Sequence, residues 1–480
     1  MKVRLVEIER RERPYRMRMP FRFGVTTATG GRQAIVRARV RLEDGSEAVG
    51  WSAEALGAKW FDKNLALRDE DNHHQLRRAL ELACEAYLDA GFDTPFGHFA
   101  ARYPQHMAAC EAEGLNALIA SYGQSLVDRA LLDALCRGLG IPFRRAVAEN
   151  HVGLAPTPIA PELAAADFAP LLRPAPLPAK IAVRHTVGLV DPILSSEIGP
   201  QDRIGDGLPE SLEEVVAFYG NRFFKLKIAG NEAADIERLE RIAAVLDRAA
   251  EPYAVTLDGN EQYSDAGAIA AFYAHLAERP ALRRLCASIL YVEQPINRAL
   301  ALSTPIDALA RRIPVIIDES DGALSAFPRA RALGYTGVSS KACKGIWKAM
   351  LNLARAARWS AGDGPAYFMS AEDLTCEPGI CLQQDLALVT LLGLTHVERN
   401  AHHFIDGFGG RSQAEARRFL AAHPDLYQEQ DGHIRLRIAK GDISIGSLDA
   451  PGFGTSVDPD FAAAEPMPKA AWPMAPAAAK

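Results

Sequence analysis

RFFKLKIAG (residues 222–230) begins a series of five short apolar runs, each of which carries a charged side chain near its end. The other four are YAVTLDGN (253–260), SILYVEQP (288–295), IPVIIDES (313–320) and TGVSSKAC (336–343). The charged side chains Lys227, Asp258, Glu293, Asp318 and Lys341 follow one another at intervals of 31, 35, 25 and 23 residues. A strand with its crossover helix takes about 30 residues. The spacing therefore indicates repeated strand–helix units.

Segments with helical patterns fill the gaps between these runs, for example AADIERLERIAAVLDRAA (233–250) and IWKAMLNLARAARW (346–359). The alternation begins at KIAVRHTVGLV (180–190) and ends with PAYFMSAED (365–373) and THVERNAHHF (395–404). Strands that alternate with helices of this length predict a parallel sheet. Eight of them predict a (β/α)₈ barrel, which collects its functional side chains at the carboxyl ends of its strands.

The two ends of the chain have a different pattern. Apolar and polar residues alternate in AIVRARVRL (34–42), which predicts an antiparallel sheet within residues 1–50. Helices are expected at 65–90 and 125–138, and the stretch between them has no clear pattern. After residue 430 the chain returns to short strands and turns. Residues 465–480 are rich in alanine and proline, which predicts a disordered tail.

Composition excludes several classes of protein. The 480 residues are 48% hydrophobic and 24% charged, as in soluble globular proteins. A net charge of −6 argues against nucleic acid or an anionic membrane as the main partner. No apolar stretch approaches the length of a membrane span. Seven cysteines without zinc spacing indicate reduced thiols and a cytoplasmic protein. Nucleotide-binding glycine motifs and the GxSxG motif of serine hydrolases are absent.

Asp258, Glu293 and Asp318 offer three carboxylates on consecutive strands. Oxygen ligands of this kind favour Mg²⁺ or Mn²⁺ and leave positions open for a substrate. The alternative is that each acid caps the helix that follows it. Three acids in the same position favour the metal site.

The lysines offer bases. Lys225 and Lys227 are two residues apart on one strand, so their side chains share a face, and each ammonium group is expected to lower the pKa of the other. Near the end of the fifth run, Lys341 is expected to face Lys227 across the barrel, and Lys344, three residues later, is a candidate for binding the substrate. A surface pair is the alternative for Lys341 and Lys344.

Two further side chains are candidates for substrate contacts at the barrel mouth. Glu372 follows the seventh strand and His402 follows the eighth. A helix cap is the alternative for Glu372, and a structural imidazole is the alternative for His402.

The ordered motifs KLK (225–227), LDGN (257–260), VEQP (292–295), IDES (317–320) and SKACKG (340–345) resemble those of the enolase superfamily. Within it, the chain is most similar to the mandelate racemase/muconate lactonizing enzyme type, in the muconate-lactonizing and dipeptide-epimerase subgroup. The resemblance implies an α+β capping domain over 1–150, a modified TIM barrel over 151–412 and a C-terminal return over 413–464 that packs with the cap.

The resemblance also implies roles for individual residues. Lys227 and Lys341 would be the catalytic acid/base pair, and Asp258, Glu293 and Asp318 would hold Mg²⁺ or Mn²⁺. Asn260 and Glu319 would orient these ligands, while Lys225 would tune Lys227 and touch the substrate carboxylate. Two capping loops, 23–29 and 53–63, would choose the substrate, with Trp60 against its distal end.

The function implied is a Mg²⁺-dependent isomerase, either a racemase/epimerase or a cycloisomerase. It would take a proton from the carbon α to a carboxylate, through a metal-stabilised enediolate, in a small carboxylate substrate. A lyase with the same site (acid dehydratase or β-elimination) is an alternative, and a catalytically silent barrel that acts as a binding module is another. A homo-oligomer is expected. The seventh strand ends in Glu372-Asp373 without a histidine, which favours the lysine-paired enzymes.

Overall fold

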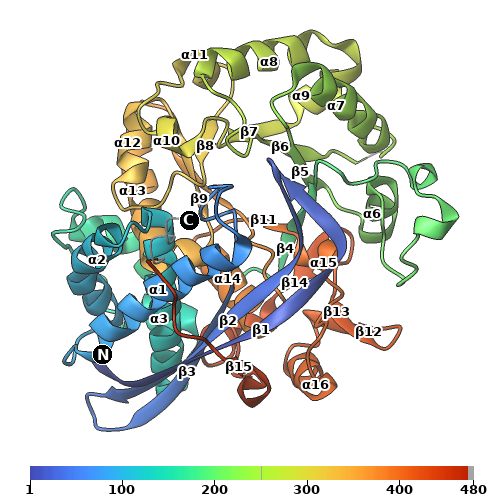
Figure 1. The fold of residues 1–480 in the computed structure, drawn as a ribbon. Helices are drawn as coiled ribbons and strands as arrows, with labels where there is room; N and C mark the ends of the chain where they lie inside the picture. Colours follow the sequence, from blue (N-terminus) through green and yellow to red (C-terminus); the bar gives the residue numbers. More distant parts are fainter. Residues whose placement is uncertain (250, 474–480) are drawn as a thin grey trace, which may run out of the picture.

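A closed barrel of eight parallel strands forms the larger part of the molecule (Figure 1). The computed structural model describes residues 1–249 and 251–473. β11 pairs with β4, with His396 opposite Ala182, and this pairing closes the ring. The short strand β14 (Asp442–Ser444) adds an antiparallel partner to β4. In chain order the eight strands are β4 (Lys180–Val187), β5 (Phe223–Lys227), β6 (Ala254–Asp258), β7 (Ile289–Glu293), β8 (Val315–Ile317), β9 (Gly337–Ser340), β10 (Phe368–Ala371) and β11 (His396–Arg399).

Strand β5 shows how the alternation of residues builds the barrel. Phe224 and Leu226 lie in the hydrophobic core. Lys225 and Lys227, on the opposite face, contact the carboxylate of Asp258 on the next strand. Successive side chains of a strand point to opposite faces. The same two-residue period therefore places apolar groups under the helices and charged groups inside the barrel.

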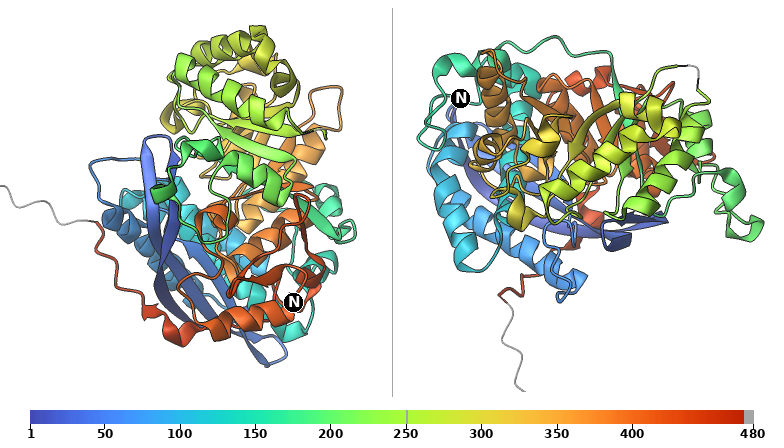
Figure 2. Two further views of the ribbon diagram at one scale, coloured as in Figure 1. Left: turned by 90° about the vertical axis from the view of Figure 1, so that its right-hand side faces the viewer. Right: turned by 90° about the horizontal axis from the view of Figure 1, so that it is seen from above.

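Helices follow the strands and cover the outside of the barrel (Figures 1 and 2). Side chains of the preceding residue cap several of them: Asn231 accepts a hydrogen bond from the amide of Ala234, and Asp265 accepts one from Ala268. The helices that follow the strands are α6 (Leu212–Tyr219), α7 (Glu232–Leu246), α8 (Ala266–Glu278), α9 (Arg283–Ala287), α10 (Arg298–Ala301), α11 (Asp307–Ala310), α12 (Ala326–Ala332), α13 (Ile346–Trp359), α14 (Ile380–Leu391) and α15 (Ala401–Phe404).

A second unit, the cap, lies against the barrel. Its sheet has the order β15-β1-β2-β3, with β1 (Val3–Phe23), β2 (Thr26–Leu42), β3 (Glu47–Ala55) and β15 (Glu465–Pro466). Strands β1 and β2 form a long hairpin that both views of Figure 2 show as a curved ribbon beside the barrel. At its tip, a Cβ on Gly24 would meet the Gln262 amide nitrogen at 2.9 Å, so the tip touches the loop after β6.

Three long helices complete the cap: α1 (Asp69–Leu88), α2 (Pro95–Ala112) and α3 (Ala117–Leu139). Helix α3 is buried between the cap sheet and the barrel. Gly50 of β3 allows a close approach, because a Cβ there would lie 2.3 Å from the carbonyl oxygen of Ala130. On its barrel side, Ser121 donates a hydrogen bond to the carbonyl of Gly322. The cap is therefore packed directly onto the barrel.

The C-terminal part returns to the cap. Glu415, on α16 (Gln413–Ala422), pairs with Arg13 at 3.1 Å, and the Trp51 indole donates a hydrogen bond to Asp458 at 2.8 Å. These contacts are those expected of a C-terminal return. The remaining elements are α4 (Phe143–Ala148), α5 (Ala169–Leu172) and the hairpin of β12 (Tyr427–Gln430) with β13 (His433–Leu436).

The predicted fold class, a (β/α)₈-type barrel with an α+β cap, is confirmed. The predicted disordered tail is wrong for residues 465–473. Glu465 and Pro466 pair with Glu12 and Arg11 at the edge of the cap sheet, and the Trp472 indole donates a hydrogen bond to the carbonyl of Glu113. Backbone pairing to a sheet edge does not depend on composition, so an Ala/Pro-rich sequence can join it. Residues 474–480 of the predicted tail lie outside the described residues.

Within the part of the chain that the structure describes, no helix combines the length and the apolar character required to cross a lipid bilayer.

Candidate active site

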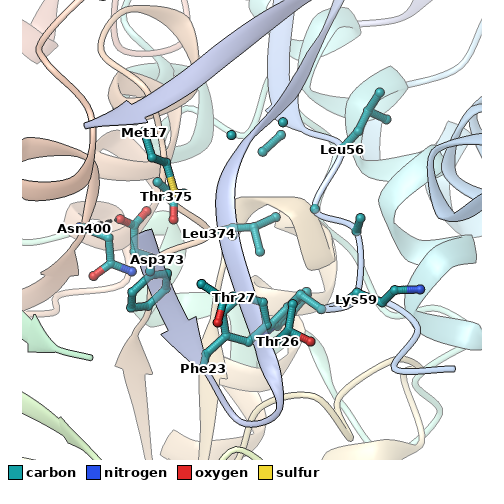
Figure 3. A pocket seen from close by; sticks show the side chains of 18 of the residues that line it. Met17, Phe23, Thr26, Thr27, Leu56, Lys59, Asp373, Leu374, Thr375 and Asn400 are labelled. Atoms are coloured by element: carbon teal, nitrogen blue, oxygen red, sulfur yellow. Dashed lines mark hydrogen bonds between the residues drawn. The ribbon is translucent and has the colours of Figure 1, made fainter. Parts of the chain in front are cut away.

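A cavity of about 220 Å³ lies between the cap and the carboxyl ends of the barrel strands (Figure 3). The β1–β2 hairpin supplies one wall with residues between Tyr15 and Gly31, and the segment from Ala55 to Trp60 supplies a second. Both capping loops predicted from the sequence therefore contribute to the cavity. The barrel supplies the floor with Lys225, Lys227, Asn260, Lys341, Asp373, Leu374, Thr375, Glu398 and Asn400.

Lys227 and Lys341 face this cavity from opposite sides of the barrel. Lys227 is the last residue of β5, and Lys341 directly follows β9. These two strands are four positions apart in either direction round the closed ring of eight. Both side chains are buried, with exposed fractions of 7% and 4%. A molecule bound between them would present one face to each ammonium group.

Three carboxylates close one arc of the ring between the two lysines. Asp258 and Glu293 are the last residues of β6 and β7 and lie in register, and Asp318 directly follows β8. All three are buried. Lys227 donates a hydrogen bond to Asp258 at 2.5 Å, and Lys341 donates one to Asp318 at 2.7 Å. Each candidate base is therefore ion-paired with one candidate metal ligand.

Lys225 occupies the centre of the barrel mouth. Its ammonium group lies 2.8 to 3.0 Å from carboxylate oxygens of four acids. Burial acts to lower the pKa of Lys225, but the surrounding carboxylates outweigh it and hold the pKa well above the ordinary lysine value. The predicted mutual lowering of the Lys225 and Lys227 pKa values is therefore corrected for Lys225. The four acids are Asp258, Glu293, Glu372 and Glu398.

The acids respond differently to this environment. Burial acts to raise the pKa of Asp318, but Lys341 and Lys344 outweigh it and lower the pKa well below the ordinary value. Burial and the nearby Asp258 carboxylate raise the pKa of Glu293 well above the ordinary value. Burial also acts to lower the pKa of Lys341, yet Asp318 raises it overall. In this arrangement Lys341 is an ammonium group, and it requires a change of charge nearby before it can act as a base.

The donor set suits a hard divalent cation. Among the described residues, the buried acceptor atoms Asn260 Oδ1 and Glu319 Oε2 have no hydrogen-bond partner, and both belong to side chains beside the three carboxylates. All these donors are oxygens, which Mg²⁺ and Mn²⁺ prefer. The three carboxylates are paired with lysines rather than gathered together. Across the described chain, one group of three side chains brings its possible metal-ligand atoms within 4.8 Å of one another. This group is Glu54, Cys376 and Cys381, at the junction of cap and barrel. Mg²⁺ binding therefore requires the ammonium groups of the lysines to move.

Ion pairs fasten the second capping loop over the mouth. Lys63 pairs with Glu261 at 2.5 Å and lies 3.5 Å from Glu319. Arg298 also pairs with Glu261, at 2.8 Å, and donates hydrogen bonds to the carbonyls of Trp60 and Phe61. Glu261 is thus held between two cations, one from the cap and one from the barrel. We call these three residues, Lys63, Glu261 and Arg298, the loop latch.

Comparison with solved structures gives the fold. An enolase from Bradyrhizobium complexed with magnesium and mandelic acid shares 16% identity with a TM-score of 0.58, over 95% of this chain and 96% of that one. A dipeptide epimerase from Enterococcus faecalis V583, complexed with Mg and the dipeptide L-Leu-L-Tyr, shares 14% identity with a TM-score of 0.58, over 94% and 99%. A 2-chloromuconate cycloisomerase from Rhodococcus opacus 1CP shares 17% with a TM-score of 0.55, over 95% and 98%. The chain therefore has the same fold as these three solved structures. No family model and no curated protein matches the sequence.

Three of the side chains predicted to bind substrate do not line the cavity of this barrel. Lys344 lies behind Asp318 and donates hydrogen bonds to Asp318 and Ser339. Glu372 is fully buried inside the barrel against Arg184 and Lys225. Neither is in a position to touch a molecule in the cavity, so both act through other groups.

His402 also lies elsewhere. Its ring hydrogen-bonds His185 at 3.3 Å and packs on Tyr219, beside a separate small cavity. It follows β11 in α15, and the turn of this helix carries the imidazole away from the barrel mouth. The predicted substrate contact of His402 is therefore corrected to a packing contact between α6 and the barrel. Trp60, by contrast, lines the cavity.

Sequence reasoning missed Glu398, which lines the cavity from β11. It accepts hydrogen bonds from Thr186 at 2.6 Å and from Lys225 at 3.0 Å. Arg184 was also missed, and it pairs with Glu372 in the same layer. The sequence signal for both residues is the two-residue alternation of side chains along a strand. It places Arg184 and Thr186 on the face of β4 that lines the barrel interior, and Glu398 on the interior face of β11.

Proposed function

We propose that this protein is a Mg²⁺-dependent isomerase that exchanges a proton on the carbon α to a carboxylate. The observation that carries this proposal is the placement of Lys227 and Lys341 on opposite sides of one cavity, four strands apart. Two bases on opposite faces allow one to remove the proton and the other to return it. The solved enolase with magnesium and mandelic acid, and the epimerase with Mg and a dipeptide, support the reaction class.

The side chains at the mouth have separate tasks in this proposal. Asp258, Glu293 and Asp318 would hold a divalent cation, which neutralises negative charge as it develops on the substrate carboxylate oxygens. Lys225 would hold the same carboxylate, because it is the central cation of the mouth. Capture of Asp318 by the cation would remove the charge that raises the pKa of Lys341 and so ease the loss of its proton.

The reaction is tested by proton exchange in deuterated water with Mg²⁺ and a panel of chiral carboxylic acids, followed by NMR. Deuterium at the α-carbon of recovered acid is the expected result. Lys227→Ala is expected to keep exchange for one enantiomer and Lys341→Ala for the other. Wild-type behaviour of either variant toward both enantiomers would contradict the two-base arrangement.

The same experiment separates the alternatives. Loss of water without deuterium in recovered acid indicates a lyase that uses the same site. No exchange, no elimination and no effect of Mg²⁺ on thermal stability indicate a binding module instead.

A further inference from the structure

The two ends of the cavity differ in charge. The barrel end holds three ammonium groups, those of Lys225, Lys227 and Lys341, each paired with at least one carboxylate of the barrel. The cap end is formed by the hairpin and the second capping loop. Figure 3 shows Phe23, Thr26 and Thr27 from the hairpin near Leu374 from the barrel. What the cap end offers a ligand decides which molecules fit the site.

Charged groups on the cap side already have partners or face solvent. The ammonium group of Lys59 donates hydrogen bonds to the carbonyls of Asn64 and Leu67, and its side chain points away from Phe23 in Figure 3. His73 is paired with Glu70. Asp69 is exposed to solvent. None of these leaves a buried charge aimed at the distal part of a ligand.

Asp373, the acid nearest to this end on the barrel side, is also satisfied. It pairs with Arg399 at 3.2 Å and accepts hydrogen bonds from the amides of Asn400 and Cys376. Its carboxylate is therefore already engaged by donors within the protein.

Several apolar side chains line the part of the cavity that remains. Phe21, Phe23, Leu56 and Trp60 each have exposed fractions of 9% or less. Tyr15 and four threonines (Thr26, Thr27, Thr29 and Thr375) add hydroxyl groups but no charge. The apolar side chains of this wall, which we call the apolar wall, are Met17, Phe21, Phe23, Leu56, Trp60 and Leu374.

We propose that the substrate is a monocarboxylate whose distal end is an uncharged apolar group, either aromatic or branched alkyl, seated against the apolar wall. This rests on the proposed function, because the carboxylate is placed at the three lysines. A second carboxylate, a phosphate or an ammonium group at the distal end would be buried without a partner, which is strongly unfavourable. A chain of several hydroxyl groups would lose its hydrogen bonds to water in the same place.

The test compares four acids that share one reacting end, a 2-hydroxy carboxylate, and differ only at the distal end. They are 2-hydroxy-2-phenylacetate, 2-hydroxy-4-methylpentanoate, 2-hydroxybutanedioate and a pentahydroxyhexanoate. Binding to the full-length protein is measured by calorimetry with Mg²⁺ present, and α-proton exchange is measured separately. We expect the two apolar acids to bind at least tenfold more tightly than the other two.

A variant makes the test specific to the wall. Met17→Lys places a cation at the distal end and is expected to reverse the preference in favour of 2-hydroxybutanedioate. Leu65→Lys adds the same charge on an exposed loop, where the side chain is 69% exposed, and is expected to leave the ranking unchanged.

The outcomes separate this proposal from the proposed function. Equal or tighter binding of the dicarboxylate or the polyhydroxy acid by the wild type overturns the apolar distal end, as does failure of both apolar acids to bind, even if α-proton exchange occurs with another acid. Preferential binding of the apolar acids without exchange of any acid upholds the apolar end and contradicts the isomerase.

Discussion

The ammonium nitrogen of Lys341 lies 4.1 Å from the centre of the Trp60 ring, so the capping loop places an aromatic face directly over a candidate base. Trp60 is 5% exposed and packs edge-on against Phe61. The ring excludes water from one side of the ammonium group and stabilises its charged form. It thus links closure of the loop to the environment of Lys341.

Trp60→Leu opens this side of the cavity to water and is therefore expected to slow α-proton exchange, with a loss of about twofold to thirtyfold in kcat/KM, the range of an interaction of roughly 0.5–2 kcal/mol. Trp60→Phe keeps an aromatic face and is expected to retain most of the activity. Thermal melts of both variants serve as the control. If both lose stability equally and keep wild-type kinetics, the ring has a packing role alone.

The loop latch predicts a second effect. Glu261→Gln removes the charge that joins Lys63 to Arg298, so residues 57–64 are expected to open more often. Hydrogen–deuterium exchange of these amides should increase, and KM should rise more than kcat falls. The loss in the free energy of unfolding is expected to be about 1–3 kcal/mol.

Glu232→Gln is the matched control for this variant, because it removes an exposed pair with His275 far from the loop. It is expected to change neither the amide exchange of residues 57–64 nor KM and kcat. Unchanged amide exchange in residues 57–64 of Glu261→Gln would show that other contacts hold the loop.

The effect of a substitution on Mg²⁺ binding can be separated from its effect on the stability of the metal-free protein. Burial, Asp258 and Glu372 raise the pKa of Glu293, so its carboxyl carries little charge without the metal. Glu293→Gln is therefore expected to cost under about 1 kcal/mol in the free energy of unfolding without Mg²⁺, like a mild substitution. It should nevertheless abolish the rise in melting temperature that Mg²⁺ produces in the wild type.

Asp318→Asn is the informative comparison. It leaves the buried ammonium group of Lys341 without its carboxylate, although Lys344 keeps Asp321, and is expected to cost about 3–5 kcal/mol even without Mg²⁺. A Mg²⁺-dependent rise in melting temperature that persists in Glu293→Gln would remove Glu293 from the metal site.

A pH dependence is expected from Asp128 in the cap. Burial raises its pKa to about 8, against the hydrogen bond from Tyr87 that lowers it. At pH values between the ordinary aspartate pKa and about 8, Asp128 keeps its proton in the folded protein but releases it in the unfolded chain. The free energy of unfolding therefore falls as the pH rises. From pH 5 to pH 7 this amounts to roughly 3 kcal/mol, at about 1.4 kcal/mol per unit.

Asp128→Asn should remove this slope. Urea denaturation at pH 5 and pH 7 is expected to show the variant gaining on the wild type as the pH rises, whereas Asp44→Asn, on an exposed turn, should show no such trend. Parallel curves for Asp128→Asn and the wild type would place the titrating group elsewhere.

The sequence predicts the barrel because one βα unit repeats with a regular length, and Asp258, Glu293 and Lys341 stand where the strands end. It does not predict the partners of those side chains. The four carboxylates around Lys225 lie 33 to 173 residues away in the sequence, and only closure of the ring brings Glu398 to it. His402 was misplaced because a short helix, rather than a strand extension, follows β11. Helix α2 escaped notice because Pro104 interrupts an already weak amphipathic pattern.

The apolar wall and the charged floor come from different stretches of the chain. Residues before 61 supply most of what a ligand's far end would touch, while the lysines all lie beyond residue 224. A duplicated gene could therefore change the residues of its β1–β2 hairpin and accept new substrates, while the lysines that handle the proton stay unchanged. The hairpin also depends on the C-terminal part of the chain, because Glu465 and Pro466 pair with Glu12 and Arg11 of β1. A chain truncated before residue 465 would lose this pairing. Its selectivity for substrates would then change, although no residue near the lysines is altered.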